Sequence, residues 1–499
     1  MKNLKNKLSV VIVGLIIFCF ASTALAKDKW INLQSKNFNV VSNADEKKTK
    51  EITQKLEQFR YTLVQLYPNV PESEPVPVTV VIFRDDRSFN PFKPIYKGKV
   101  RKDISGYFQS GEDGNIIAID STVETLRVIF HEYVHLLLNF STVELPPWIN
   151  EGLAELYSTF EIDKNEVVLG TPLPFHVEYL QNNGLKLIPL KELIQVDFNS
   201  PAYNESDKSS FFYTQSWLFV HYLMISERGV RKPQLFKFIK LIRIGKTPEQ
   251  AFTEAFGVGF EEMQDTLRGY VNNKYYPIVK YQLKAPALDK NLPIQTLSEA
   301  QTQVYLGNLL LQIGRLEDAE KSLQQAKALD TNLVETLENL GFIAMKQEKY
   351  SQAKEYFQQA IARSSKNYQV YYQYANALYL MGKIDNKLSG EVLKEIKNNA
   401  QSAIKLRPEF AQAYNLAALS ELGLGEDYKT GLEQAKMAVL LAPRKKQFLL
   451  TQAQLQIATT DYQGAKKILQ PLLKEEDIEL KTKAELLLRE IEEKAQNKE

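Results

Sequence analysis

The spacing of hydrophobic residues divides the first part of the chain into strands and helices. Apolar residues at helical spacing over 44–67 predict a long amphipathic helix. Turn-forming residues at 111–114 separate two extended stretches and predict a hairpin. Short apolar or alternating β-branched runs typical of strands lie at 30–33, 38–41, 76–83, 105–109 and 115–120.

Helical patterns follow the predicted hairpin. Ser121 and Glu124 fit a capping box, which predicts a helix that opens there and runs to about Asn139. The Pro146-Pro147 pair interrupts this pattern, and a second helix is predicted from about Asn150. Further helices are predicted at 210–227, 232–244, 248–256 and 259–273.

The pattern changes beyond residue 283. Residues 284–297 lack periodicity and are predicted to be a linker. From 298 the sequence repeats every 34 residues, with a nine-residue insertion near 386–395. The matched pairs are Gly307 and Gly341, Leu316 and Tyr350, Ala319 and Ala353, and Ala326 and Ala360.

This period, with small residues where two helices would cross, resembles the tetratricopeptide repeat. The resemblance covers about 298–480 and implies an all-α solenoid that binds protein partners. A polar helix at 481–494 would cap it, so the predicted repeat domain is 298–499. An unrelated antiparallel helical bundle is the alternative.

Charge and the N-terminus bear on location and partners. The chain has 62 Lys and Arg against 60 Asp and Glu, which argues against a nucleic-acid-binding protein. Three lysines, an apolar run at 8–20 and Ala24-Leu25-Ala26 predict a signal peptide at 1–26, with an uncleaved anchor as the alternative. No stable membrane span is expected after cleavage. Cleavage would remove the single cysteine, Cys19, so a bound metal would need nitrogen and oxygen ligands.

The candidate chemistry lies in the helix predicted before the Pro-Pro pair. His131, Glu132 and His135 form an H-E-x-x-H motif. Histidines four residues apart share one face of a helix, where both can bind one Zn²⁺. Glu132 is then placed to act on a water at the metal. A pair of core histidines beside an incidental glutamate is the alternative.

The segment 148–152, Trp-Ile-Asn-Glu-Gly, offers the next carboxylate. Metzincins would have Gly and His where this chain has Leu138 and Ser141, so that class is excluded. Residues 27–283 resemble the gluzincins, and among them the bacterial peptidase MA-like domains. The resemblance implies an α+β zincin-like metallopeptidase domain in which Glu151 is the third zinc ligand and Glu155 orients a ligand imidazole. An exposed carboxylate near a helix N-terminus is the alternative for Glu151.

The resemblance also implies a reaction. A zinc-activated water would hydrolyse peptide bonds, with Glu132 as general base, and an extended peptide would pair with an edge strand at 105–109. Tyr213 is the preferred residue for stabilising the oxyanion, whereas His221 is expected to be a core histidine and His176 a surface one. The Gly-Ala-Met-Glu-Asn motif of aminopeptidases is missing, which favours an endopeptidase.

The sequence therefore predicts an exported bacterial zinc metallopeptidase, periplasmic or secreted, that acts on a peptide or protein substrate. Its repeats would recruit the substrate or another protein partner. The main alternative is a non-catalytic, zinc-stabilised scaffold that acts through its repeats. A repeat adaptor with a degenerate N-terminal domain is disfavoured, because all four site residues of the motifs are present.

Overall fold

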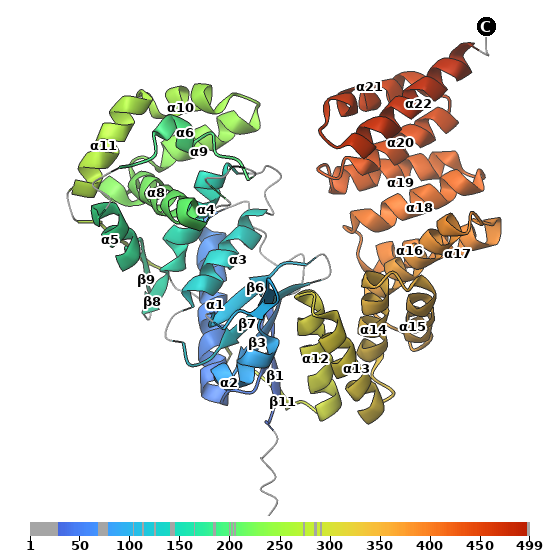
Figure 1. The fold of residues 1–499 in the computed structure, drawn as a ribbon, viewed down its shortest axis with the longest axis horizontal. Coiled ribbons are helices and arrows are strands. Elements are labelled where there is room, and N and C mark those ends of the chain that lie inside the picture. Colours follow the sequence, from blue (N-terminus) through green and yellow to red (C-terminus); the bar gives the residue numbers. More distant parts are fainter. Residues whose placement is uncertain are drawn as a thin grey trace, which may run out of the picture.

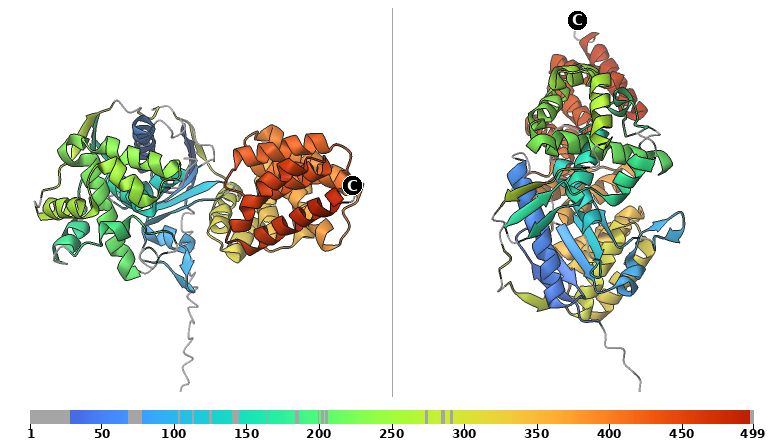
Figure 2. Two further views of the ribbon diagram at one scale, coloured as in Figure 1. Left: turned by 90° about the horizontal axis from the view of Figure 1, so that it is seen from above. Right: turned by 90° about the vertical axis from the view of Figure 1, so that its left-hand side faces the viewer.

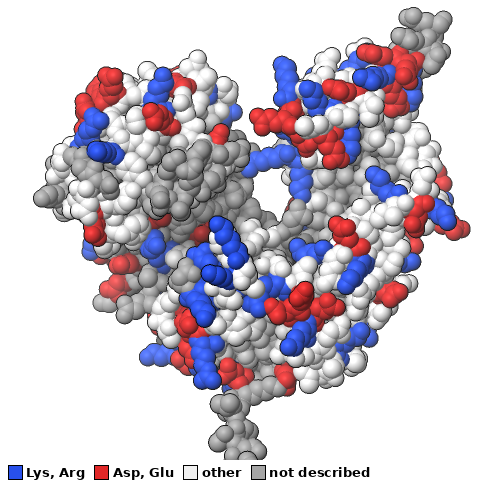
Figure 3. Space-filling model, in the orientation of Figure 1, with Lys and Arg blue, Asp and Glu red and all other residues white. Residues whose placement is uncertain are grey.

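The computed structural model describes residues 28–496 with short gaps, and these residues form two lobes (Figure 1). The gaps are at 68–77, 103, 112–113, 124–125, 140–144, 164, 183–185, 199, 201–202, 204–205, 273–274, 284–286 and 290–291. The predicted signal peptide and Glu124 of the predicted capping box lie outside the described residues. The surface is hollowed between the two lobes (Figure 3).

A six-stranded mixed sheet lies in the first lobe, with the strand order β11-β1-β2-β3-β7-β6. β2, β3 and β7 are parallel, whereas β1, β6 and β11 pair antiparallel to their neighbours. The predicted hairpin is confirmed as β6 and β7, and β6 is an edge strand. The strands are β1 (Ile31–Gln34), β2 (Phe38–Ser42), β3 (Val78–Phe83), β6 (Gly106–Gln109), β7 (Asn115–Asp120) and β11 (Ile294–Thr296).

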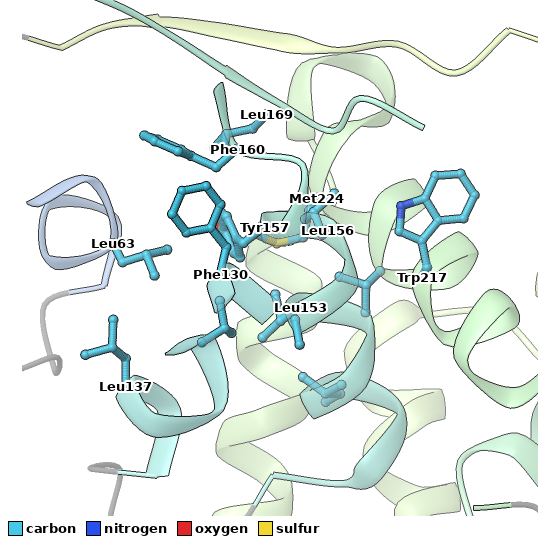
Figure 4. Packing of buried hydrophobic residues seen from close by; sticks show 14 of the residues in the cluster. Leu63, Phe130, Leu137, Leu153, Leu156, Tyr157, Phe160, Leu169, Trp217 and Met224 are labelled. Carbon is cyan, nitrogen blue, oxygen red and sulfur yellow. The ribbon is translucent and has the colours of Figure 1, made fainter. Parts of the chain in front are cut away.

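Helices cover one face of this sheet and form the main hydrophobic core. Phe59 and Phe130 stack with their ring centroids 4.2 Å apart, which joins the first two of these helices. Figure 4 shows how Leu63, Tyr157 and Trp217 continue this packing from one helix to the next. The helices are α1 (Glu46–Leu66), α3 (Arg127–Asn139), α4 (Pro147–Ser158) and α8 (Ser206–Ile225).

The first lobe also contains two small sheets and further helices. β8, β9 and β10 form a three-stranded sheet, and β4 and β5 form a separate two-stranded one. The remaining elements of this lobe are α2 (Asp86–Phe89), η1 (Asn90–Phe92), β4 (Ile95–Tyr96), β5 (Lys99–Val100), β8 (Glu161–Asp163), β9 (Glu166–Leu169), α5 (Pro174–Asn182), α6 (Leu190–Leu193), η2 (Ser226–Gly229), α9 (Lys232–Arg243), α10 (Pro248–Phe256), α11 (Phe260–Asn272) and β10 (Val279–Gln282).

The start of α3 differs from the prediction. The helix begins at Arg127, six residues after Ser121. The Ser121 hydroxyl instead donates a hydrogen bond to the carbonyl of Arg84, 2.8 Å away, and the Ser121 amide donates to the carbonyl of Phe83. Ser121 therefore ties the end of β7 to the end of β3 and is not the cap of α3. α4 begins at Pro147 rather than at about Asn150, since proline is well tolerated in the first turn of a helix.

The predicted linker also needs a correction. It contains β11, which pairs with β1 in the main sheet. The next helix, α12 (Glu299–Gln312), places Leu306 and Leu309 in a buried cluster with Val81, Phe83 and Tyr107 on the second face of that sheet. The first repeat helix thus completes the core of the first lobe. The pairing of β11 depends on a distant strand, so the local sequence pattern could not reveal it.

The second lobe is a solenoid of antiparallel helices (Figure 1). A helical repeat region at this end of the chain was predicted. The helices after α12 are α13 (Leu316–Leu329), α14 (Val334–Lys346), α15 (Tyr350–Ala362), α16 (Tyr368–Ile384), α17 (Gly390–Leu406), α18 (Ala411–Leu424), α19 (Tyr428–Leu441), α20 (Gln447–Ala458), α21 (Tyr462–Leu469), η3 (Gln470–Lys474) and α22 (Ile478–Gln496).

Small residues lie where the repeat helices approach one another. A Cβ atom on Gly307 would lie 2.8 Å from Leu323, and one on Gly341 would lie 2.4 Å from Phe357. The insertion near 386–395 lengthens helices: α16 and α17 have 17 residues each, whereas α14 and α15 have 13. No helix among the described residues is long and apolar enough to cross a membrane.

Candidate metal site

The two histidines of the H-E-x-x-H motif lie one turn apart on α3. His131 and His135 are both half-buried, and their ring centroids are 4.9 Å apart. Their Nε2 atoms lie 3.2 Å from each other, so both rings direct the same nitrogen toward one point. The i, i+4 spacing produces this arrangement because those positions share a helix face.

Glu151 reaches the same point from α4. Its Oε2 atom lies 3.4 Å from the Nε2 atom of each histidine. The possible ligand atoms of His131, His135 and Glu151 all lie within 4.8 Å of one another. Glu151 is buried, and its Oε2 atom has no hydrogen-bond partner among the described residues. The alternative of an exposed carboxylate at this position is therefore wrong.

The electrostatics keep Glu151 in its charged form. Burial by itself would raise the pKa of Glu151, but the nearby imidazoles of His131 and His135 outweigh it and hold this pKa at about 2. Burial lowers the pKa of His135, yet the nearby carboxylates of Glu151 and Glu132 raise it overall. Two imidazole nitrogens and one carboxylate oxygen that converge in this way fit Zn²⁺, which binds three such ligands in catalytic sites.

Residues on α4 contact the outer nitrogens of both imidazoles. The His131 Nδ1 atom lies 3.4 Å from Oε1 of Glu155. The His135 Nδ1 atom lies 3.2 Å from Oδ1 of Asn150, a contact that sequence reasoning missed. Asn150 directly precedes Glu151, so one turn of α4 carries both a possible ligand and a partner of a second ligand. Such contacts fix the orientation of metal-binding histidines.

His176 was predicted to lie on the surface, and this prediction is wrong. It lies in α5 and is fully buried, with its ring stacked on Trp217 at a centroid distance of 5.1 Å. Its Nε2 atom is 3.3 Å from Oε2 of Glu155, and its Nδ1 atom is 2.8 Å from the Thr214 hydroxyl. A proline-rich segment is often exposed. Here two polar partners satisfy the hydrogen-bonding nitrogens of the buried imidazole, and the indole of Trp217 packs against its ring.

Glu132 does not belong to the group of possible metal ligands. It is half-buried on α3, and its charge contributes to raising the pKa of both His135 and Tyr213. Its carboxylate therefore lies near the proposed ligands without occupying their meeting point. This position suits a residue that exchanges protons beside a metal.

Two tyrosines lie beside Glu151. Tyr203, which sequence reasoning missed, donates a hydrogen bond of 2.8 Å from its hydroxyl to Oε1 of Glu151. Tyr213 on α8 is half-buried. Its pKa is raised mainly by burial and to a smaller extent by the charge of Glu151. The two rings are 6.1 Å apart. A phenol whose pKa is raised stays protonated and can donate a hydrogen bond at neutral pH.

His221 is a core histidine, as predicted. It is buried, its Nδ1 atom lies 2.8 Å from the Tyr270 hydroxyl, and its Nε2 atom lies 2.9 Å from the carbonyl of Gly170. Burial lowers its pKa to about 4. With both nitrogens engaged, His221 takes no part in the candidate site.

Comparisons with known proteins identify the repeats. Residues 344–386 match the tetratricopeptide repeat family. The Hsp70-Hsp90 organizing protein of Triticum aestivum is 24% identical over 161 residues, which is 32% of this chain and 26% of that protein. The chain thus spans about a quarter of the length of the curated relative it matches.

Solved structures with similar helices include YrrB, a TPR protein with an unusual peptide-binding site, and TTC0263, a thermophilic TPR protein of Thermus thermophilus. YrrB is 18% identical, with a TM-score of 0.32, and the match covers 37% of this chain and 91% of YrrB. TTC0263 is 19% identical, with a TM-score of 0.30, and the match covers 38% of this chain and 98% of TTC0263. The family match and the successive antiparallel helices make the C-terminal part of the chain a tetratricopeptide-like solenoid, joined to an N-terminal domain with a mixed sheet.

If zinc binds at the candidate site, replacing His176 by Phe is expected to weaken that binding about 10-fold. Phenylalanine keeps a ring against Trp217 but removes both hydrogen bonds, so Glu155 is held less firmly against His131. The measurement is a zinc titration against a competing chelator. His221→Phe is the matched control, because it also removes two hydrogen bonds from a buried histidine near Trp217. Equal zinc affinity in both variants would contradict this role of His176.

Proposed function

We propose that this protein is a zinc-dependent metallopeptidase whose repeats bind a protein partner or substrate. The observation that carries the proposal is the convergence of His131, His135 and Glu151, with a buried carboxylate oxygen that lacks a hydrogen-bond partner among the described residues. A buried charged atom in this situation is costly unless a cation binds it. The zincin-like fold of residues 27–283 and the repeat domain at 298–499 belong to the same proposal, and the segment 284–297 between them supplies β11 to the main sheet.

Zinc bound by these three residues would supply a Lewis acid that polarises a peptide carbonyl and makes a water more acidic. Glu132 accepts a proton from the attacking water and passes it to the amine that leaves. The Tyr213 hydroxyl donates a hydrogen bond to the oxygen that becomes negative. Tyr203 holds Glu151 through Oε1, which leaves Oε2 directed at the two imidazoles.

The edge strand β6 supports a peptide as the substrate. Among the described strands it pairs with β7 alone, and it precedes α3 in the chain. An extended peptide can add to such an edge through backbone hydrogen bonds. This mode of binding suits an endopeptidase, because it needs no free end of the substrate.

We further propose that the protein is exported to the periplasm or secreted, in keeping with its N-terminal sequence.

A non-catalytic scaffold is the second candidate, and the comparisons favour it over a peptidase. They concern tetratricopeptide repeats, which present extended surfaces to protein partners. In this alternative the metal site only stabilises the N-terminal domain. Glu132 separates the two proposals, because it is outside the ligand group and a purely structural metal site does not need it.

Metal analysis and a peptide library test the proposal. The purified protein is expected to bind one zinc and to cleave peptides in a chelator-sensitive manner. Glu151→Ala should lose most of the zinc and all cleavage, because a carboxylate is removed from the meeting point of the ligands. Glu155 lies one turn further along α4 and contacts the outer nitrogen of His131. The Glu155→Ala variant should therefore bind zinc only about 10-fold to 100-fold more weakly than the parent protein.

Each other outcome rejects one part of the proposal. A protein with one bound zinc that cleaves no peptide would exclude the peptidase and support the scaffold. A protein without zinc, or a Glu151→Ala variant with full zinc content, would reject the metal site with the ligands named here.

A further inference from the structure

The β4–β5 hairpin projects from the first lobe next to the main sheet (Figure 2). Ile95 pairs with Val100 and Tyr96 with Lys99 in a two-stranded sheet of their own. The turn between them consists of Lys97 and Gly98, both with positive φ angles of 48° and 74°. Two such residues form the tight turn that matches the twist of a hairpin. The segment is therefore a defined structural element with a convex tip.

The tip combines apolar and cationic side chains. Ile95 is 48% exposed and Tyr96 is 58% exposed. Lys97, Lys99 and Lys102 are exposed around them, and the Lys97 ammonium lies 5.3 Å from the centre of the Tyr96 ring. The sequence from 87 to 102 holds six Lys or Arg and no acidic residue. In Figure 3, Lys and Arg side chains gather on this face over the region of the sheet.

Two parts of the protein hold the base of the hairpin. Lys93 is buried, and its ammonium donates to Asp86 at 2.5 Å and to the carbonyl of Lys102 at 3.2 Å. Tyr107 of β6 donates to the carbonyl of Phe92. Arg315, which follows α12 of the first repeat, donates to the carbonyl of Lys93 at 3.2 Å. A base held in this way loses little conformational entropy when the tip binds a partner.

We propose that this hairpin docks on an anionic lipid bilayer. A convex tip cannot enclose a peptide, but it can enter a soft surface. Tyrosine and an aliphatic residue suit the boundary between headgroups and acyl chains, and lysines around them suit acidic headgroups. An acidic protein surface would pair with the lysines but would leave Ile95 and Tyr96 without an apolar environment.

Vesicle sedimentation tests the proposal on the exported protein. Vesicles of phosphatidylcholine with phosphatidylglycerol should bind it, and pure phosphatidylcholine should bind it at least 10-fold more weakly. Replacing Lys97, Lys99 and Lys102 together by Glu should lower binding about 100-fold or more, since each lysine near an anionic surface contributes about 5-fold. Replacing Ile95 and Tyr96 by Ser should also weaken binding.

The matched control replaces Lys466, Lys467 and Lys474 by Glu, which changes the net charge equally on a lysine-rich surface of α21 and η3. Its binding should equal that of the parent protein. All variants share the same N-terminal segment, so differences between them report on the hairpin. Equal binding of the two triple variants would overturn the proposal. The proposal would also fail if the parent protein did not bind anionic vesicles. Binding to polyglutamate without binding to these vesicles would indicate an acidic protein as the partner instead.

Discussion

Replacing Glu132 by Gln is expected to lower the proposed peptide cleavage by about 100-fold to 10,000-fold, the range in which general acid–base catalysis contributes. Glutamine has nearly the same shape but cannot accept a proton from water. Zinc content should stay at one per chain, because the possible ligand atoms come from His131, His135 and Glu151. Zinc analysis and cleavage of the most sensitive library peptide measure the two effects on the same sample.

The control for this experiment is Glu262→Gln, an equal change at an exposed position of α11. It should leave both zinc and cleavage unchanged. A Glu132→Gln variant that cleaves as fast as the parent would rule out Glu132 as the general base. A variant that loses its zinc would instead make Glu132 a part of the metal site.

Replacing Gly152 by Ala is expected to destabilise the first lobe by about 1 to 3 kcal/mol or more, as overpacking does. A Cβ atom at this position would lie 2.4 Å from a methyl group of Val220 and 2.5 Å from the carbonyl oxygen of Ser216. The carbonyl belongs to the backbone of α8, so relief requires α4 and α8 to move apart. Because Glu151 is the neighbouring residue, this movement should also weaken zinc binding.

Urea denaturation and zinc titration of the same variant measure both effects. Gly269→Ala is the matched control, since Gly269 also lies in a helix but a Cβ atom there would have no neighbouring atom within 4 Å. Alanine there should stabilise the protein by about 0.5 to 1 kcal/mol, because it favours helix more than glycine does. Equal stability of the two variants would show that α4 and α8 are less closely packed than the structure indicates.

The predictable part of the candidate site is its local part. His131 and His135 meet because helix geometry brings positions four apart onto one face, and spacing alone expresses this. Glu151 comes from another helix, and the resemblance to gluzincins indicated it where spacing could not. Tyr203 is 52 residues from its partner Glu151 and lies in a segment without a periodic pattern, so no sequence signal marked it.

The burial of His176 also could not be predicted from the local sequence. A histidine that closely follows two prolines, Pro172 and Pro174, looks exposed when only its neighbours in sequence are considered. Its burial results from Trp217 and Thr214 of α8 and from Glu155 of α4, which are distant in sequence. The predicted cap at Ser121 failed for a related reason, because the hydroxyl bonds to Arg84 at the end of another strand.

The sequence by itself determined five of the six strands of the main sheet, most helices, the period of the repeats and the face shared by the two motif histidines. These depend on contacts between residues a few positions apart, so a local pattern expresses them. Only the tertiary structure decided that Glu151 reaches both imidazoles, that β11 and α12 complete the first lobe, and that His176 lies behind Glu155. Those features depend on side chains from distant segments packing in three dimensions, and no local pattern carries that information.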